Sequence, residues 1–170
     1  MGAAAQEDDW SGRRAPALAE FERLAEQAFS RLPEAFRRLC EGVVIQVADF
    51  PDDETLEEMG LESPFDLLGL FRGVGLAQGG FAAALATGQL PNMVWLYRRP
   101  LLDYWAEHDE TLGGLVTHVL VHEIGHHVGL SDADMERIEN QAGETAGEPA
   151  SGLLRTISDI RALPPHTEER

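Results

Sequence analysis

The chain has 170 residues, with 13 Lys and Arg against 30 Asp and Glu, which gives a formal net charge of −17. This charge disfavours nucleic acid and anionic membranes as partners, because binding to phosphates needs clustered basic side chains. Cys40 is the single cysteine, so an internal disulfide is excluded. No apolar run approaches the roughly 20 residues of a membrane span, and the first residues lack the pattern of a signal peptide. These features predict a soluble, cytoplasmic protein.

The pattern divides the chain into three segments. Residues 1–15 are small, polar and charged, and we expect them to be a disordered lead. Residues 16–139 carry the periodic apolar pattern of one folded domain. Residues 140–170 form a polar tail, in which the spacing of apolar residues allows a short helix at 153–163.

The first half of the domain predicts helices followed by a strand. Apolar residues recur every three or four positions from 18 to 39, and Pro33 should divide this run into two helices. Cys40 lies beside the apolar stripe and is expected to be a buried thiol. The β-branched run at 43–47 predicts a strand. The acidic segment 51–64 reads as a solvated loop with at most one helical turn.

The second half predicts two more strands and the strongest helix. Residues 67–71 and 93–97 are strand candidates, and the glycines between positions 73 and 80 form a flexible connection that lacks the dinucleotide-binding pattern. A short helix is expected within 101–110. A long helix should run from about 112 to 128 and end at Gly129, a natural left-handed stop. The expected fold is therefore α+β.

The long helix contains the segment with chemical meaning, His-Glu-Ile-Gly-His at 122–126. Its two histidines, His122 and His126, are four residues apart, so both imidazoles lie on one helix face, about 6 Å apart along the axis. Two imidazoles in this arrangement can bind one Zn²⁺ ion. Glu123 follows the first histidine and can reach a water on that ion, which is the arrangement of a general base.

A third ligand is needed for an open catalytic zinc site. Gly129 allows a sharp turn after the helix, and Asp132, six residues past His126, can then return to the metal. The predicted metal ligands are thus His122, His126 and Asp132. The predicted function is hydrolysis of peptide bonds by a metal-activated water, with Glu123 as general base. Two imidazoles and a carboxylate also accept iron and other first-row metals.

Three neighbouring residues have other expected roles. His118 continues the histidine stripe, but it is eight residues from His126, about 12 Å along the axis, so the two cannot share one tetrahedral ion. We expect His118 to support the site, to form a hydrogen bond in the core, or to face the substrate. His127 points elsewhere and is expected to be structural or exposed. Asp134 is expected to cap a helix or to support the ligands.

Residues 122–132 resemble the elongated zinc signature of the metzincin clan, with aspartate replacing the third histidine. Together with shorter segments, they resemble the minimal zincin-like metallopeptidase family of bacteria over roughly residues 17–138. The supporting segments are Leu32-Pro33-Glu34, Val43-Val-Ile, Leu68-Gly69-Leu-Phe71, Leu90-Pro91 and Leu96-Tyr97-Arg-Arg-Pro100.

The resemblance implies a small mixed β-sheet packed against an N-terminal helix and a zinc-binding active-site helix. It implies His122, His126 and Asp132 as ligands, Glu123 as the catalytic base, Zn²⁺ as cofactor, and a peptide or extended polypeptide as substrate. The chain departs from metzincins in having no methionine after Met135. A gluzincin-like third ligand would instead come from Glu136, Glu139 or Glu144.

An alternative function remains open. The chain is short, so it also suits a catalytically weak or inactive zinc-binding module that acts in interactions or stabilises its own fold. Zinc with a fourth protein ligand in place of water would characterise that module.

Overall fold

The computed structural model describes residues 10–73 and 91–146. Its first half contains a 3-10 turn at Trp10–Gly12, α1 (Leu18–Arg31), α2 (Glu34–Leu39), β1 (Val44–Ala48), α3 (Asp53–Met59), a 3-10 turn at Pro64–Asp66 and β2 (Gly69–Arg72). Its second half contains β3 (Met93–Tyr97), α5 (Arg98–Glu107), α6 (Leu112–Val128) and α7 (Asp132–Ala146). The glycine-rich connection after Gly73 and the helix expected at 153–163 lie outside the described residues.

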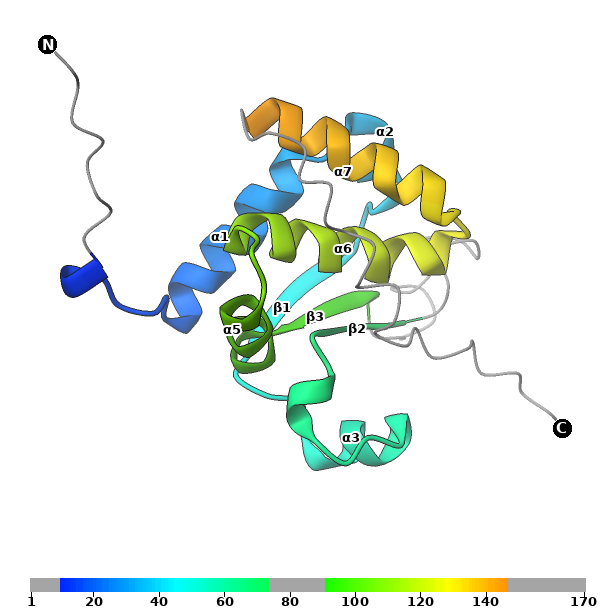
Figure 1. Cartoon of the computed structure of the whole chain (residues 1–170). Coiled ribbons are helices and arrows are strands. Elements are labelled where there is room, and N and C mark those ends of the chain that lie inside the picture. The colour runs from blue at the N-terminus through cyan, green and yellow to red at the C-terminus, as the bar shows by residue number, and fades with distance from the viewer. Residues whose placement is uncertain (1–9, 74–90, 147–170) are drawn as a thin grey trace, which may run out of the picture.

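The three described strands form one mixed sheet in the order β1-β3-β2 (Figure 1). β1 pairs with β3 in parallel and β2 pairs with β3 antiparallel. Helix α1 packs against β1, and α6 packs against β2 and β3, so the two helices cover one face of the sheet. Helix α7 contacts both α1 and α6. The expected α+β fold, with a small mixed sheet against an N-terminal helix and the histidine-bearing helix, is confirmed.

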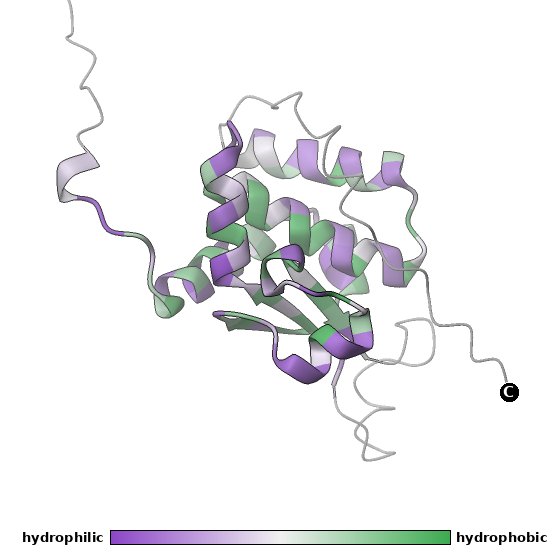
Figure 2. Cartoon of the chain, turned by 60° about the horizontal axis from the view of Figure 1, so that its bottom comes forward, coloured by the Kyte–Doolittle hydropathy of each residue, from purple (hydrophilic) through white to green (hydrophobic). Residues whose placement is uncertain are grey.

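The hydrophobic core lies between the sheet and these helices, and in Figure 2 the hydrophobic colour concentrates on the strands and on the helix sides that face them. The core members that are fully buried include Phe21, Phe36, Leu96, Leu120 and Ile124. Cys40 belongs to this core, as expected, and burial raises the pKa of its thiol to about 12. Among the described residues, no helix is both long and apolar enough to cross a membrane.

Most local predictions agree with the structure. Pro33 separates α1 from α2, and the strand at 93–97 and the helix at 112–128 have the predicted bounds. The acidic segment forms a fuller helix than expected, because the Asp52 side chain accepts a hydrogen bond from the Thr55 N–H and caps α3. Helix α7 continues through position 140, where the tail was expected to begin, as far as Ala146.

The strand β3 has no free edge to which an extended substrate could pair. In the structure β3 is central and pairs with a strand on each side. In the described sheet, β2 lies beside the histidine-bearing helix and is paired along one edge only.

Candidate metal centre and active site

Helix α6 is fixed at both ends by its own sequence. The Thr111 hydroxyl accepts a hydrogen bond from the Gly114 N–H at 3.0 Å, which caps the first turn. Gly129 adopts φ 77°, and the Leu130 N–H donates to the Gly125 carbonyl at 3.0 Å, which closes the last turn. These contacts set the direction in which the chain enters α7.

His122 and His126 lie on successive turns of α6, as the four-residue spacing predicts. Their ring centroids are 5.7 Å apart and the rings are inclined by 68°. Two imidazoles on one tetrahedral zinc ion, with bonds of about 2.0–2.1 Å, have centroids about 5 Å apart. The two rings therefore lie near each other along α6, but His122 Nε2 faces Glu139, and among the described residues His122, His126 and Asp132 do not form a metal-ligand group.

Asp132 is the first residue of α7 and its side chain is exposed. Burial and the neighbouring His122 lower the pKa of His126, and the negative charge of Asp132 opposes that shift. Asp132 thus lies close enough to act electrostatically on a predicted co-ligand. Asp134 has the capping role that was one of its two expected roles, because it exchanges hydrogen bonds with Ser131 at the start of α7.

Glu123 points toward the sheet. It packs over Gly69 of β2, where a Cβ would lie 3.4 Å from the Glu123 Cγ and 2.6 Å from the Val119 Cγ1. The Glu123 carboxylate accepts a hydrogen bond from the backbone N–H of Phe71. Burial raises the pKa of Glu123 to about 7, although the Phe71 hydrogen bond and His122 oppose the shift. Glu123 is therefore a carboxyl group poised near neutrality beside β2.

The other candidate groups around the helix have packing roles. The His127 ring stacks on Phe71 with centroids 3.9 Å apart, which agrees with its expected structural role. Tyr97 is buried and bonds to Thr55, and burial raises the pKa of its hydroxyl to about 12. Tyr104 stacks on His108 with centroids 3.8 Å apart.

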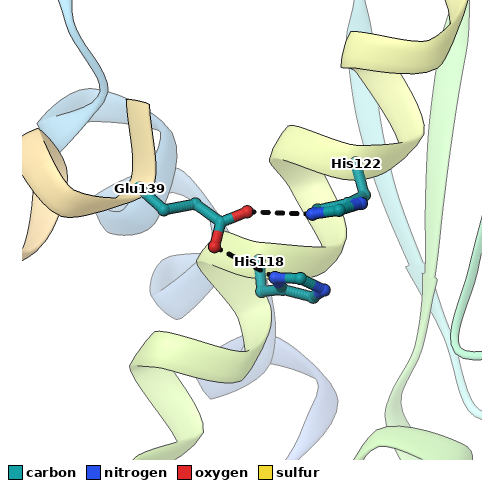
Figure 3. A group of neighbouring side chains, drawn as sticks. All are labelled: His118, His122 and Glu139. Atoms are coloured by element: carbon teal, nitrogen blue, oxygen red, sulfur yellow. Dashed lines mark hydrogen bonds and ion pairs between the residues drawn. The ribbon is translucent and has the colours of Figure 1, made fainter. Parts of the chain in front are cut away.

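A further group forms between α6 and α7, and the sequence analysis did not assemble it. The Glu139 carboxylate lies between two histidines of α6 (Figure 3): Oε2 is 3.0 Å from His118 Nδ1 and Oε1 is 3.2 Å from His122 Nε2. Burial raises the pKa of Glu139, but the bonds to His118 and His122 outweigh it, so the pKa lies below its ordinary value. His118 thus has one of its expected roles, a hydrogen bond in the core.

This group has the composition of a metal site. In the part of the chain that the structure describes, His118, His122 and Glu139 each offer a donor atom, and these atoms lie within 4.8 Å of one another. His118 is 3% exposed and the Glu139 side chain is 7% exposed. His118 Nε2 and Glu139 Oε1 are buried without a hydrogen-bond partner. His122 is therefore shared between the predicted ligand pair and this second group.

A signal for Glu139 was present in the sequence. Met135, Ile138, Glu139 and Ala142 have the spacing of one buried helix stripe, and Glu139 is the only polar residue on it. A charged residue on a buried stripe needs a partner. The identity of the partner of Glu139 depends on how α7 packs on α6, and the spacing of residues within α7 does not reveal that packing.

Comparison with known proteins places the chain in a family. A search of curated proteins found no match. The model of a family described as zincin-like metallopeptidase matches residues 40–142, which is more than half of the chain and includes the whole of α6 and most of α7. The chain belongs to the zincin-like metallopeptidase family.

Proposed function

We propose that this protein is a zinc-dependent peptidase in which His122, His126 and Asp132 hold the ion and Glu123 is the general base. The observation that carries the proposal is the coincidence of two features on one helix: two imidazoles on successive turns with centroids 5.7 Å apart, and a carboxyl group on the residue after the first histidine whose pKa burial raises to about 7. Membership in the zincin-like family supports the metallopeptidase class.

The residues present fit a divalent cation. Two imidazoles and one carboxylate are a common donor set for catalytic zinc, and the buried oxygen of Glu139 that lacks a hydrogen bond adds negative charge beside His122. A zinc ion bound there would polarise the scissile carbonyl and lower the pKa of a water molecule to near 7.

Glu123 would perform the proton transfers. Its carboxylate is fixed by the Phe71 N–H, so it needs no reorientation to accept a proton from the attacking water. A carboxyl group with a pKa near neutrality is also able to return that proton to the leaving amine. The substrate backbone would lie in extended form along β2, because β2 carries the Phe71 contact and β3 is already paired on both sides.

Hydrolysis of a quenched fluorescent peptide mixture by the zinc-loaded protein tests this proposal. Glu123→Gln should lower the rate by about 100-fold or more, the size expected for loss of a general base. Glu136→Gln is the matched control, because Glu136 is exposed on α7, and its rate should equal that of the unmodified protein. Equal rates for the unmodified protein and Glu123→Gln would refute the assignment of Glu123.

The second candidate is a zinc-binding module without effective catalysis. The observation in its favour is Glu139, because a carboxylate oxygen 3.2 Å from His122 Nε2 is able to complete the metal coordination in place of water. X-ray absorption of the zinc-loaded protein separates the two functions: four protein donors on the ion favour the module, and three favour the peptidase.

A further inference from the structure

We infer that His118, His122 and Glu139 form a second position for a divalent metal ion, one helical turn before the proposed catalytic position. This inner position lies between α6 and α7. Its ligands would be one nitrogen from each of two histidines and the carboxylate of one glutamate. Metal binding at the inner position does not depend on catalysis. Only the competition between the inner and the catalytic position rests on the proposed function.

The distances between the donor atoms carry the inference. Tetrahedral zinc with bonds of about 2.0–2.1 Å places neighbouring ligand atoms about 3.3 Å apart. His118 Nδ1 lies 3.0 Å from Glu139 Oε2, and His122 Nε2 lies 3.2 Å from Glu139 Oε1. Each carboxylate oxygen and the nitrogen that faces it therefore already have nearly the separation that a common ion would impose, and the three donor atoms lie within 4.8 Å of one another.

Burial supplies a second and independent observation. His118 is 3% exposed, and Oε1 of Glu139 is buried and lies 3.2 Å from His122 Nε2 without forming a hydrogen bond. A buried polar atom without a partner destabilises the folded chain, because it has lost its hydrogen bonds to water. A cation bound between the three residues would accept the lone pairs of Oε1 and of one nitrogen on each ring.

The surrounding charge also favours a cation. Glu110 is partly buried, and its charge acts on both His118 and Glu139. One further carboxylate therefore acts on this group from outside it, whereas no Lys or Arg side chain is bonded to Glu139 among its described contacts. Ion binding would require the His118 and His122 rings to part by about 1 Å, from the observed centroid distance of 4.0 Å toward the separation of about 5 Å for co-ligands.

The inner position shares His122 with the proposed catalytic position. The His122 Nε2 atom faces Glu139, so an ion held there takes that nitrogen away from His126 and Asp132. An ion at the inner position would then hold the protein in a form with an incomplete catalytic site. Occupancy of the two positions would regulate the peptidase through metal availability.

Cobalt binding to the full chain tests the inner position. Co²⁺ serves as a spectroscopic probe, and its affinity is measured by absorption in competition with a chelator. The His126→Asn/Asp132→Asn double variant lacks both outer ligands, and both side chains are exposed, so the core is untouched. We expect this variant to bind about one Co²⁺ ion. Absence of Co²⁺ binding by the folded double variant would overturn the inference.

A third substitution locates the ion. Adding Glu139→Gln to the double variant should weaken Co²⁺ binding by about 100-fold, whereas adding Glu136→Gln should leave it unchanged. Circular dichroism establishes that each variant is folded. Unchanged binding after Glu139→Gln would also overturn the inference. Neither Co²⁺ result depends on peptide hydrolysis. The peptidase proposal is tested separately, by the hydrolysis rate of Glu123→Gln, so the two proposals can fail independently.

Discussion

Gly69 sets the distance between β2 and α6, and its replacement by alanine tests that role. An added Cβ would lie 2.6 Å from the Val119 Cγ1 and 3.0 Å from the Trp95 carbonyl oxygen. The carbonyl belongs to central strand β3 and cannot move without disturbing both of its pairings. The helix must therefore shift away from the sheet, and Glu123 shifts with it.

The expected loss of stability follows from two opposing contributions. Overpacking in a core costs about 1–3 kcal/mol, and replacing glycine inside a strand recovers about 0.5–1 kcal/mol of chain entropy. Because the backbone contact cannot relax, we expect a net loss of about 1–2 kcal/mol. For a chain of this length, each kcal/mol corresponds to about 2–4 °C in Tm, so the Tm should fall by about 2–8 °C.

A double-mutant cycle with Val119→Ala distinguishes this contact from a general effect. Removing the Val119 methyl groups makes room for the new Cβ, so the double variant should be more stable than the sum of the two single losses predicts, by about 0.5–1 kcal/mol. Urea denaturation of the four proteins measures the coupling. Additive losses would show that the Gly69 and Val119 contact does not limit the approach of α6 to the sheet.

Three further predictions concern single groups. Gly129→Ala should destabilise the protein by about 1–2 kcal/mol in chemical denaturation, and Gly129→Asn by less, because φ is 77° there and asparagine tolerates the left-handed region; equal losses would contradict this reason. The Cys40 thiol should react with a thiol reagent at pH 8 only after unfolding, since it is buried and its pKa is raised to about 12; rapid labelling of the native protein would contradict it. Burial raises the pKa of Tyr97 from 10.0 to about 12, so its contribution to stability is complete below pH 10 and declines between pH 10 and 12 by at most about 1.4 kcal/mol per pH unit. The unmodified protein should lose stability faster over that interval than Tyr97→Phe in urea titrations, and parallel losses would count against this assignment.

Local sequence signals were sufficient to predict the elements that have a clear apolar pattern or clear capping residues. The strand Met93–Tyr97 is a run of apolar and aromatic residues, and the helix Leu112–Val128 has a threonine cap and a terminal glycine. Helix α7 was missed because its residues are mostly polar. Its start is encoded by the Ser131 and Asp134 capping box, and its buried face by only a few residues such as Met135 and Ala142.

The candidate site shows the same division between local and tertiary information. The His122 and His126 pair follows from helix geometry alone, because four residues make about one turn. The contact of Glu123 with Phe71 joins α6 to a strand far away in the sequence, and the contact of Glu139 with His122 joins two consecutive helices. Those contacts depend on how the sheet and α7 pack against α6, and no spacing rule within one element contains that information.

The placement of α6 between the sheet and α7 separates two kinds of chemistry. The side chain of Glu123 leaves the helix toward β2, and the side chains of His118 and His122 leave it toward Glu139. In the proposed enzyme, substitution of Glu139 would therefore change ion binding without contacting Glu123, and substitutions on β2 would change the surroundings of Glu123 without contacting Glu139. Ion retention and proton transfer would then be adjustable from different sides of one helix.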